Sequence, residues 1–148
     1  MAKVAECSQD ILVEGKELNQ GDGTPLIINT NLLEISNDGI WLYFMPLFGP
    51  GLRRIETKHL RDPLLSDDQL ATHIEDYARV PPYAGIAINN GGDLYFSSFT
   101  ESAICKLDKS LNWQTVVSDP RISYPNEGEV GQDGFMYFPA SRARRWFL

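Results

Sequence analysis

A turn followed by an aromatic strand recurs three times in this chain, and this repeat restricts the fold more than any other feature. The three strands carry nearly the same core, and they are Leu42–Phe44, Leu94–Phe96 and Met136–Phe138. Each follows a turn that contains aspartate and glycine: Asp38-Gly39, Gly92-Asp93 and Asp133-Gly134. The second and third strands begin 42 residues apart, which is the length of a β-propeller blade. The repeat therefore predicts an all-β chain in which each unit is one blade.

The residues around these cores predict antiparallel meanders. Four strands are expected in the second unit: Gly85–Ile88, Leu94–Ser98, Ala103–Leu107 and Trp113–Val117. The first unit offers Leu32–Ile35, Ile40–Met45 and Leu52–Glu56, and the third offers Glu129–Val130, Phe135–Phe138 and a last strand near Arg145–Leu148. Short turns join these strands, as in a four-stranded blade. We expect a partial β-propeller of about three four-stranded blades over residues 31–148, with Phe96 buried against an adjacent blade.

The first and second cores begin 52 residues apart, and an inserted helix accounts for the additional length. Ser66 is a suitable N-cap, and Gln69 follows at the capping-box position. Three apolar residues then recur at helical spacing: Leu70, Ile74 and Tyr77. The sequence therefore predicts one inserted α-helix over residues 66–78.

Residues 1–30 precede the repeats and are predicted to form a separate strand or hairpin segment. The turn signal Gln20–Gly23 lies between two short apolar runs, Ile11–Val13 and Leu26–Ile28. The first residues lack the apolar stretch of a signal peptide, so the sequence as written predicts a cytoplasmic protein.

The charge of the chain restricts its partners. The formal net charge is −7, which argues against affinity for nucleic acid or for an anionic membrane, since both favour a positive field. The longest apolar run, Ile40–Phe48, contains a proline and is shorter than the roughly 20 residues of a membrane span. Cys7 and Cys105 lie in unrelated contexts and are expected to be free thiols.

Five stretches have specific sequences that general strand and turn preferences do not explain: Leu26–Asn31, Asn37–Leu47, Leu60–Leu70, Asp119–Arg121 and Tyr124–Asn126. They resemble the yellow / major royal jelly family, most closely its microbial, dopachrome-tautomerase-related members. The resemblance covers residues 10–140. It implies a six-bladed propeller, distantly related to gluconolactonase-like proteins, whose full-length members are often secreted and usually more than twice this long. The chain resembles a short or truncated member.

The resemblance also implies a function in pigment or secondary metabolism. It suggests binding of a small molecule, such as a ring-type aromatic or amine metabolite, with tautomerase- or lactone-type chemistry or an accessory role. The sequence identifies no nucleophile, acid or base, so it leaves open whether the chain is an enzyme. The alternatives are a non-enzymatic interaction module and an inactive truncated fragment.

Candidate site residues follow from the alignment of the repeats, because propeller ligands bind where the innermost strands converge. The alignment places three sets of residues at successive levels: Asn31, Tyr83 and Pro125; Leu32, Ala84 and Asn126; Leu33, Gly85 and Glu127. Polar residues at this mouth predict a ligand site at Asn29, Asn31 and Tyr83.

A divalent cation is the cofactor that the relation to lactonase-like propellers implies. In those proteins Glu, Asn and Asp side chains of this region hold the metal. Asn126 and Glu127 are the candidate ligands here, because oxygen donors suit calcium or magnesium. The alternative is that both are turn residues before a strand.

Three units do not close a propeller. An open set of blades leaves strand edges and apolar faces exposed, and these are templates for association. The sequence therefore predicts that the isolated chain self-associates or is poorly soluble.

Overall fold

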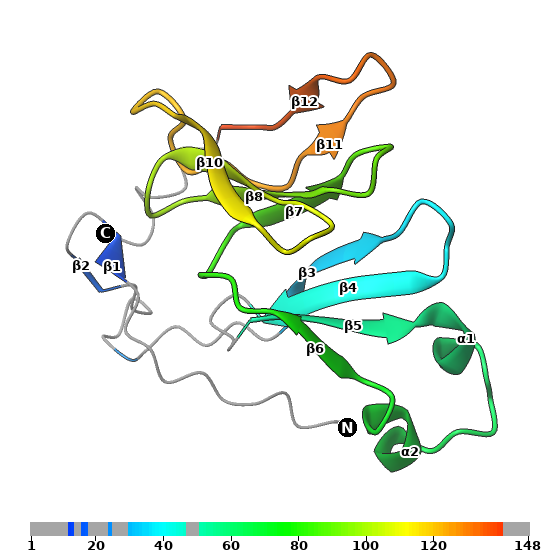
Figure 1. Ribbon diagram of the computed structural model, residues 1–148. Coiled ribbons are helices and arrows are strands. Elements are labelled where there is room, and N and C mark those ends of the chain that lie inside the picture. Colours follow the sequence, from blue (N-terminus) through cyan, green and yellow to red (C-terminus); the bar gives the residue numbers. More distant parts are fainter. Residues whose placement is uncertain (1–11, 14–15, 18–23, 25–29, 47–50, 141–148) are drawn as a thin grey trace.

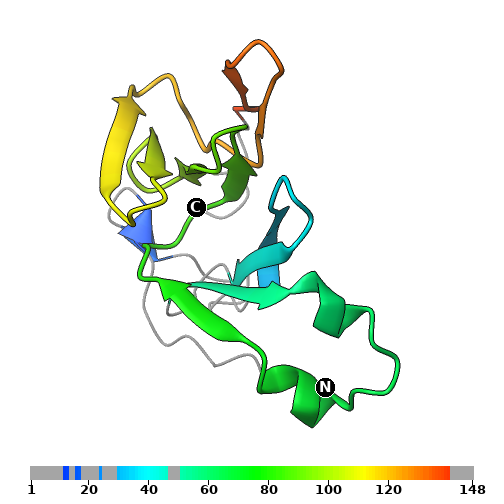
Figure 2. The same ribbon diagram turned by 45° about the vertical axis from the view of Figure 1, so that its right-hand side comes forward.

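The computed structural model describes residues 12–13, 16–17, 24, 30–46 and 51–140. Their strands form two four-stranded antiparallel sheets and two short hairpins. The two large sheets follow each other along the chain and stand side by side, with the last hairpin beyond the second sheet (Figures 1 and 2). This arrangement confirms the predicted all-β partial propeller.

Blade 1 is the first four-stranded sheet, and its strands are in sequence order. They are β3 (Thr30–Ile35), β4 (Trp41–Pro46), β5 (Leu52–Glu56) and β6 (Glu75–Ala78). The turn between β3 and β4 is closed by the Ser36 hydroxyl, which donates to Asp38 Oδ1 over 2.6 Å. Gly39 completes it with a φ of 70°, a left-handed value that glycine adopts without strain.

Blade 2 has the same meander. Its strands are β7 (Gly85–Ile88), β8 (Leu94–Ser98), β9 (Ala103–Leu107) and β10 (Trp113–Ser118). The predicted strands of this unit are confirmed almost residue for residue. Phe96 of β8 is fully buried, because its face of the sheet packs against blade 1, as predicted.

The third unit is smaller in the described part of the chain. It is a hairpin of β11 (Glu129–Val130) and β12 (Met136–Tyr137). The predicted last strand near Arg145–Leu148 lies outside the described residues. Near the start of the chain, β1 (Leu12–Val13) pairs with β2 (Lys16–Glu17), whereas the predicted partner Leu26–Ile28 lies outside the described residues.

The predicted helix over 66–78 is wrong in its extent. The structure has two short helices, α1 (Thr57–Leu60) and α2 (Asp67–Ala71), and residues 75–78 form β6 instead. The predicted capping box is confirmed: Ser66 accepts from the Gln69 backbone, and Gln69 accepts from the Ser66 backbone. In the described part of the chain no helix is long and apolar enough to cross a membrane.

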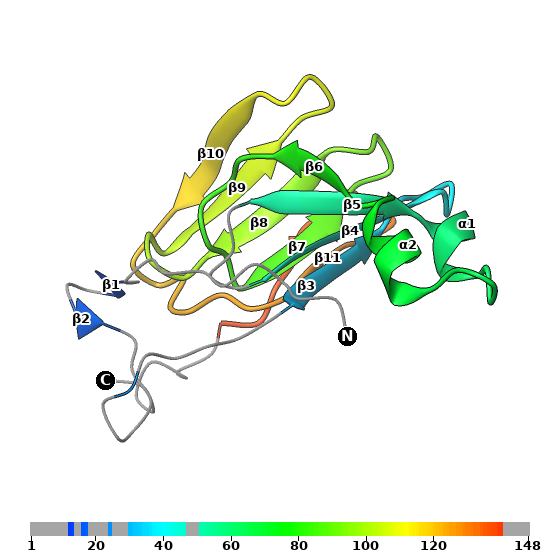
Figure 3. The ribbon, with the colours of Figure 1, turned by 90° about the horizontal axis from the view of Figure 1, so that it is seen from below.

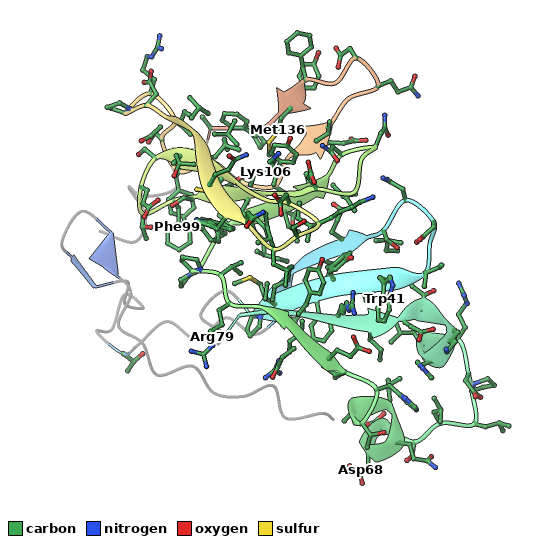
Figure 4. All side chains as sticks on the ribbon, viewed as in Figure 1. Trp41, Asp68, Arg79, Phe99, Lys106 and Met136 are labelled. Atoms are coloured by element: carbon green, nitrogen blue, oxygen red, sulfur yellow. The ribbon has the colours of Figure 1, made fainter. Side chains whose placement is uncertain are left out.

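Strand β6 forms because pairing with β5 outweighs the helical spacing of its apolar residues. Arg53 donates to Asp76 over 3.1 Å, and Arg54 lies 2.9 Å from Glu75. The Arg54 guanidinium also lies 3.9 Å from the ring centre of Trp41, which Figure 4 labels, and 4.7 Å from that of Tyr77. Cation–π contacts of this kind hold an outer strand onto its sheet.

The hydrophobic core lies between the two blades. Leu32, Tyr43 and Met45 come from blade 1, and they share a cluster with Ile86, Leu94, Phe96, Cys105 and Leu107 of blade 2. Tyr83 and Phe96 of this cluster form an aromatic triangle with Trp113, which is 37% exposed at the edge of the core; the ring centroids are 5.2–5.4 Å apart. The packing of one blade face on the next therefore supplies most of the burial.

Candidate functional site

The innermost strands of the three units lie next to one another. β7 contacts β3 on one side and β11 on the other, as Figure 3 shows from below. A hydrogen bond of 2.7 Å from the Asn37 side chain to the Asn89 carbonyl oxygen links the turns that follow β3 and β7. The Ser97 hydroxyl donates to the Asn126 carbonyl oxygen over 2.8 Å and links blade 2 to the third unit.

Strand pairing shows which residues of the three inner strands are equivalent. The three tyrosines of the repeat, Tyr43, Tyr95 and Tyr137, stand opposite Glu34, Ala87 and Glu129. Glu34, Ala87 and Glu129 therefore occupy the same level on neighbouring strands. Since the middle member is a small alanine, two carboxylates flank it on adjacent units.

The predicted sets of equivalent inner-strand residues are wrong by one residue for the first unit. Ile35 pairs with Leu42, whereas Ile88 pairs with Leu94 and Val130 with Met136, so the turn of blade 1 is one residue longer. Leu32 is consequently the equivalent of Gly85 and Glu127, in place of the predicted Leu33. A shift of one residue moves a side chain to the opposite face of a sheet.

The equivalence of Gly85 and Glu127 in the second and third units is confirmed by a close approach of their backbones. A Cβ atom added to Gly85 would lie 2.6 Å from the Glu127 Cα atom and 2.6 Å from the Asn126 carbonyl oxygen. Only glycine leaves room for the third unit to approach β7 so closely. Asn126 and Glu127 lie beside this contact, and the Asn126 amide donates to the Pro139 carbonyl over 3.1 Å.

The carboxylates at this inner edge act on Glu34. Burial raises the pKa of the Glu34 carboxyl, and the negative charges of Glu129 and Glu127 raise it further. A hydrogen bond of 3.2 Å from the Ile35 amide to Glu34 Oε1 opposes the shift. We call Glu34, Glu127 and Glu129 the acidic wall. Its members come from two units, and the two carboxylates of the third unit disfavour the negative charge on Glu34.

Tyr83 was predicted to contact a ligand, but it lies in the core and not at an open edge of the inner strands. Its side chain is only 1% exposed and packs in the core against Phe96 and Trp113. Burial, and after it the electrostatic effect of Cys105 and Glu101, raises the pKa of its hydroxyl. Tyr83 therefore fills the core and offers no open surface to a ligand.

The other two predicted ligand residues are described in part or not at all. Asn29 lies outside the described residues, and Asn31 is described only as backbone within β3. The structure thus brings none of the side chains predicted as a ligand site into one described cluster.

The oxygen donors of the acidic wall suit a hard cation, but they are too few to form a complete metal site. Carboxylate and amide oxygens from Glu127, Glu129 and Asn126 are the donors that calcium and magnesium prefer. Among the described residues, however, no three acidic, histidine or cysteine side chains come close enough to hold a metal ion. Any cation bound at this wall would need further oxygen ligands.

Two features escaped the sequence reasoning. His59 and His73 stack in parallel, with ring centroids 3.7 Å apart and an angle of 7° between the rings. A cleft of about 390 Å³ also opens between blade 2 and the third unit, and its lining includes Asn89, Tyr95 and Met136. The histidines belong to α1 and the segment after α2, a contact that no local pattern could have indicated.

The chain matches no protein-family model and no curated protein. Solved structures do match. A virginiamycin B lyase from Staphylococcus aureus superimposes with a TM-score of 0.55 at 20% identity, over 82% of this chain and 40% of that one. A gluconolactonase from Xanthomonas campestris gives a TM-score of 0.57 at 21% identity, again over 82% and 40%.

A third structure, hydrazine synthase from Kuenenia stuttgartiensis, gives a TM-score of 0.57 at 14% identity, over 89% of this chain and 33% of that one. At these identities the likeness shows the fold alone, which is that of β-propellers. The chain spans 40% or less of the length of these three proteins. The three are not yellow / royal jelly proteins, so that resemblance stays a prediction.

Proposed function

We propose that this chain is a small-molecule-binding propeller segment whose acidic wall contacts the ligand. The observation that carries the proposal is the gathering of Glu34, Glu127 and Glu129 at the edge where the inner strands meet. Propeller ligands bind where the innermost strands converge, and clusters of this kind occur at functional sites more often than elsewhere.

The electrostatics of the wall support a binding role. A carboxylate whose pKa is raised by burial and by neighbouring carboxylates opposes folding, because its charged form is disfavoured in the folded state. An arrangement that costs stability is expected where it serves a ligand. The negative field favours a cationic or neutral ligand, such as an amine, over an anionic one.

A divalent cation is part of the proposal in a limited form. Glu127 and Asn126 supply donors of the right type, and the remaining oxygen ligands would come from outside the described residues or from the small molecule itself. Calcium or magnesium bound there would neutralise the repulsion on Glu34. This would link cation binding to thermal stability, since a ligand that binds only the folded state stabilises it.

The chemistry of the ligand is proposed by analogy. The resemblance to the yellow / major royal jelly family suggests tautomerase-type reactions, and the likeness in fold to a gluconolactonase suggests lactones. A lactone is a small, polar and uncharged molecule, which suits the acidic wall because the wall disfavours anions. A non-enzymatic binding module is the alternative where turnover is absent.

Thermal melts of the 148-residue chain with added calcium or magnesium chloride test the proposal. We expect the melting temperature to rise with cation concentration. At a cation concentration about ten times Kd the stabilisation is about 1.4 kcal/mol. Glu127→Gln should remove most of this rise, because it deletes a charge from the wall without changing the size of the side chain.

The matched control is Glu101→Gln, which changes an exposed carboxylate in the turn between β8 and β9. It should leave the cation response intact. An absent response in the wild type, or an equal loss in both variants, would contradict the proposal. Hydrolysis of gluconolactone, followed with a pH indicator, then separates an enzyme from a binding module.

A further inference from the structure

On strands β3 and β4, one face of blade 1 is apolar and partly open, whereas on β5 the same face carries Arg53 and the buried Ile55. Leu33 pairs with Phe44, and Ile35 pairs with Leu42, so these four side chains share the face that points away from blade 2. Leu33 is 57% exposed and Ile35 is 53% exposed, whereas Leu42 and Phe44 are half-buried. We call these four residues the leading face.

The leading face has a structural counterpart in blade 2, and there it is covered. By register, the equivalents of Leu33, Ile35, Leu42 and Phe44 are Ile86, Ile88, Leu94 and Phe96. Three of them are at most 3% exposed, because they pack against the opposite face of blade 1. The leading face thus carries the residue pattern of a surface that another blade covers.

The opposite end of the molecule offers the complementary surface. Phe135 is 69% exposed and Tyr137 is 59% exposed on the third unit. Tyr137 is the equivalent of Tyr43, which in blade 1 is 8% exposed and packs against blade 2. Met136, labelled in Figure 4, lines the cleft toward blade 2, and Phe135 lines it as well. We call the exposed surface of Tyr137, with Phe135 beside it, the trailing face.

The leading face and the trailing face therefore correspond to the two sides of the contact between blade 1 and blade 2. The contact between blade 1 and blade 2 joins a Tyr43-type face to a Phe96-type face, and the described part of the chain carries one open example of each. An exposed patch of large apolar side chains marks an interaction site more often than chance. A surface that repeats the internal contact would cover both.

We propose that a second copy of this chain supplies that surface. The leading face of each copy packs on the trailing face of the other, so that two equal contacts close a ring with two-fold symmetry. The internal contact supports this occupant, because the Tyr43 face of blade 1 already packs against the Phe96 face of blade 2 within the chain. A head-to-tail contact closes in this way only if the rotation between copies returns to the start.

Light scattering after size-exclusion chromatography of the 148-residue chain tests the proposal. The expected mass is twice 16.7 kDa, independent of further increases in concentration. Ile35→Lys and Tyr137→Glu each place a charge in both contacts of the dimer. Each should weaken dimerisation by about 100-fold or more, because a buried charge without a partner is costly.

Mixing the two variants gives the decisive outcome. A mixed dimer has one contact between two unchanged faces and one contact in which the introduced lysine meets the introduced glutamate, so the dimer mass should return. Pairing of leading face with leading face would not give this rescue. Leu64→Lys is the control, because Leu64 is 87% exposed in the loop between α1 and α2 and belongs to neither face.

A monomer at all accessible concentrations, or an open series of larger masses, would overturn the proposal. So would dimerisation that survives both single changes. Circular dichroism melts show whether each variant keeps its fold. If Ile35→Lys does not, Leu33→Lys, at a side chain that is 57% exposed, replaces it as the change to the leading face, and the mixing experiment is done with Tyr137→Glu.

Discussion

Blade 2 and the third unit carry almost the same motif in different surroundings. Leu94–Phe96 and Met136–Phe138 both contribute the second strand of a hairpin, and in both the tyrosine stands opposite an inner-strand residue. Phe96 is nevertheless completely buried, whereas its equivalent Phe138 is only half-buried, and Tyr137 beside it is 59% exposed. The motif therefore decides how the two strands pair, and the neighbouring blades decide how much of each side chain is buried.

This difference separates local from tertiary contributions to stability. Blade 2 has a covered face on the side of blade 1 and four strands, and the aromatic triangle around Phe96 fills its core. The third unit, in its described residues, is a two-stranded hairpin in which the Tyr137 hydroxyl donates to Asp133 over 2.6 Å. Two-stranded hairpins are marginal in water without a covered face.

The largest expected effect is in blade 2. Phe96→Ala should lower the free energy of unfolding by about 3–5 kcal/mol, because the side chain leaves a cavity between Tyr83 and Trp113. Urea melts followed by circular dichroism measure this value. Tyr137→Ala, which removes an exposed aromatic side chain of the third unit, should cost less than about 1 kcal/mol in the monomer. A loss below about 1 kcal/mol for Phe96→Ala would mean that the two regions do not differ.

A medium effect is expected at the contact between the two regions. Gly85→Ala introduces a Cβ atom 2.6 Å from the Asn126 carbonyl oxygen, so the third unit must move away from β7. The cost should be about 1–3 kcal/mol, with faster hydrogen exchange of the β12 amides than of the β8 amides.

Gly91→Ala is the control for this change. A Cβ atom there would meet only side-chain atoms of Asn89, the nearest at 3.2 Å, which can rotate away. Equal hydrogen exchange of the β12 amides in both variants would show that Gly85 is not what allows the third unit to pack on blade 2.

The smallest effect concerns the acidic wall, which joins blade 1 to the third unit. The pKa of Glu34 is raised in the folded state, so its contribution to stability is complete below the unfolded-state pKa and is lost as the pH rises through the folded-state pKa. Glu34→Gln should therefore stabilise the chain at neutral pH by at most about 1 kcal/mol, given solvent screening at a half-exposed site. The gain should vanish below about pH 4.

Thermal melts at a series of pH values measure this difference. A nuclear magnetic resonance titration of Glu34 adds the link to the third unit: Glu129→Gln should bring the Glu34 pKa closer to its ordinary value. An unchanged Glu34 titration would place the third unit too far from blade 1 for their charges to interact.

Most of the fold could be predicted from the sequence because the repeat is local and strong. The strands around Leu42, Leu94 and Met136 and the capping box at Ser66 depend on near neighbours in the chain, and all are confirmed. Residues 75–78 depend on a distant partner. Their apolar residues have helical spacing, but β5 offers hydrogen bonds and two arginines to pair with Glu75 and Asp76.

The site was harder to predict for a geometric reason. Glu127 was predicted from the repeat and belongs to the acidic wall, but Glu34 and Glu129 were missed. The alignment of blade 1 was set by its motif in β4, and the longer turn displaced every residue of β3 by one level. Asn126 and Glu127 as cation ligands, and Asn29 and Asn31 as ligand residues, remain predictions.

The longer turn of blade 1 has a consequence for how such repeats diverge. The additional residue between Ile35 and Leu42 leaves both strands and their pairing intact, because it is accommodated in the turn. Yet it changes the spacing between the inner strand and the second strand by one residue. An ungapped alignment of the repeats on their second strands therefore matches the wrong residues of the inner strands. Ancestral reconstruction of these repeats should therefore treat the inner strand and the following three strands as separate alignment blocks.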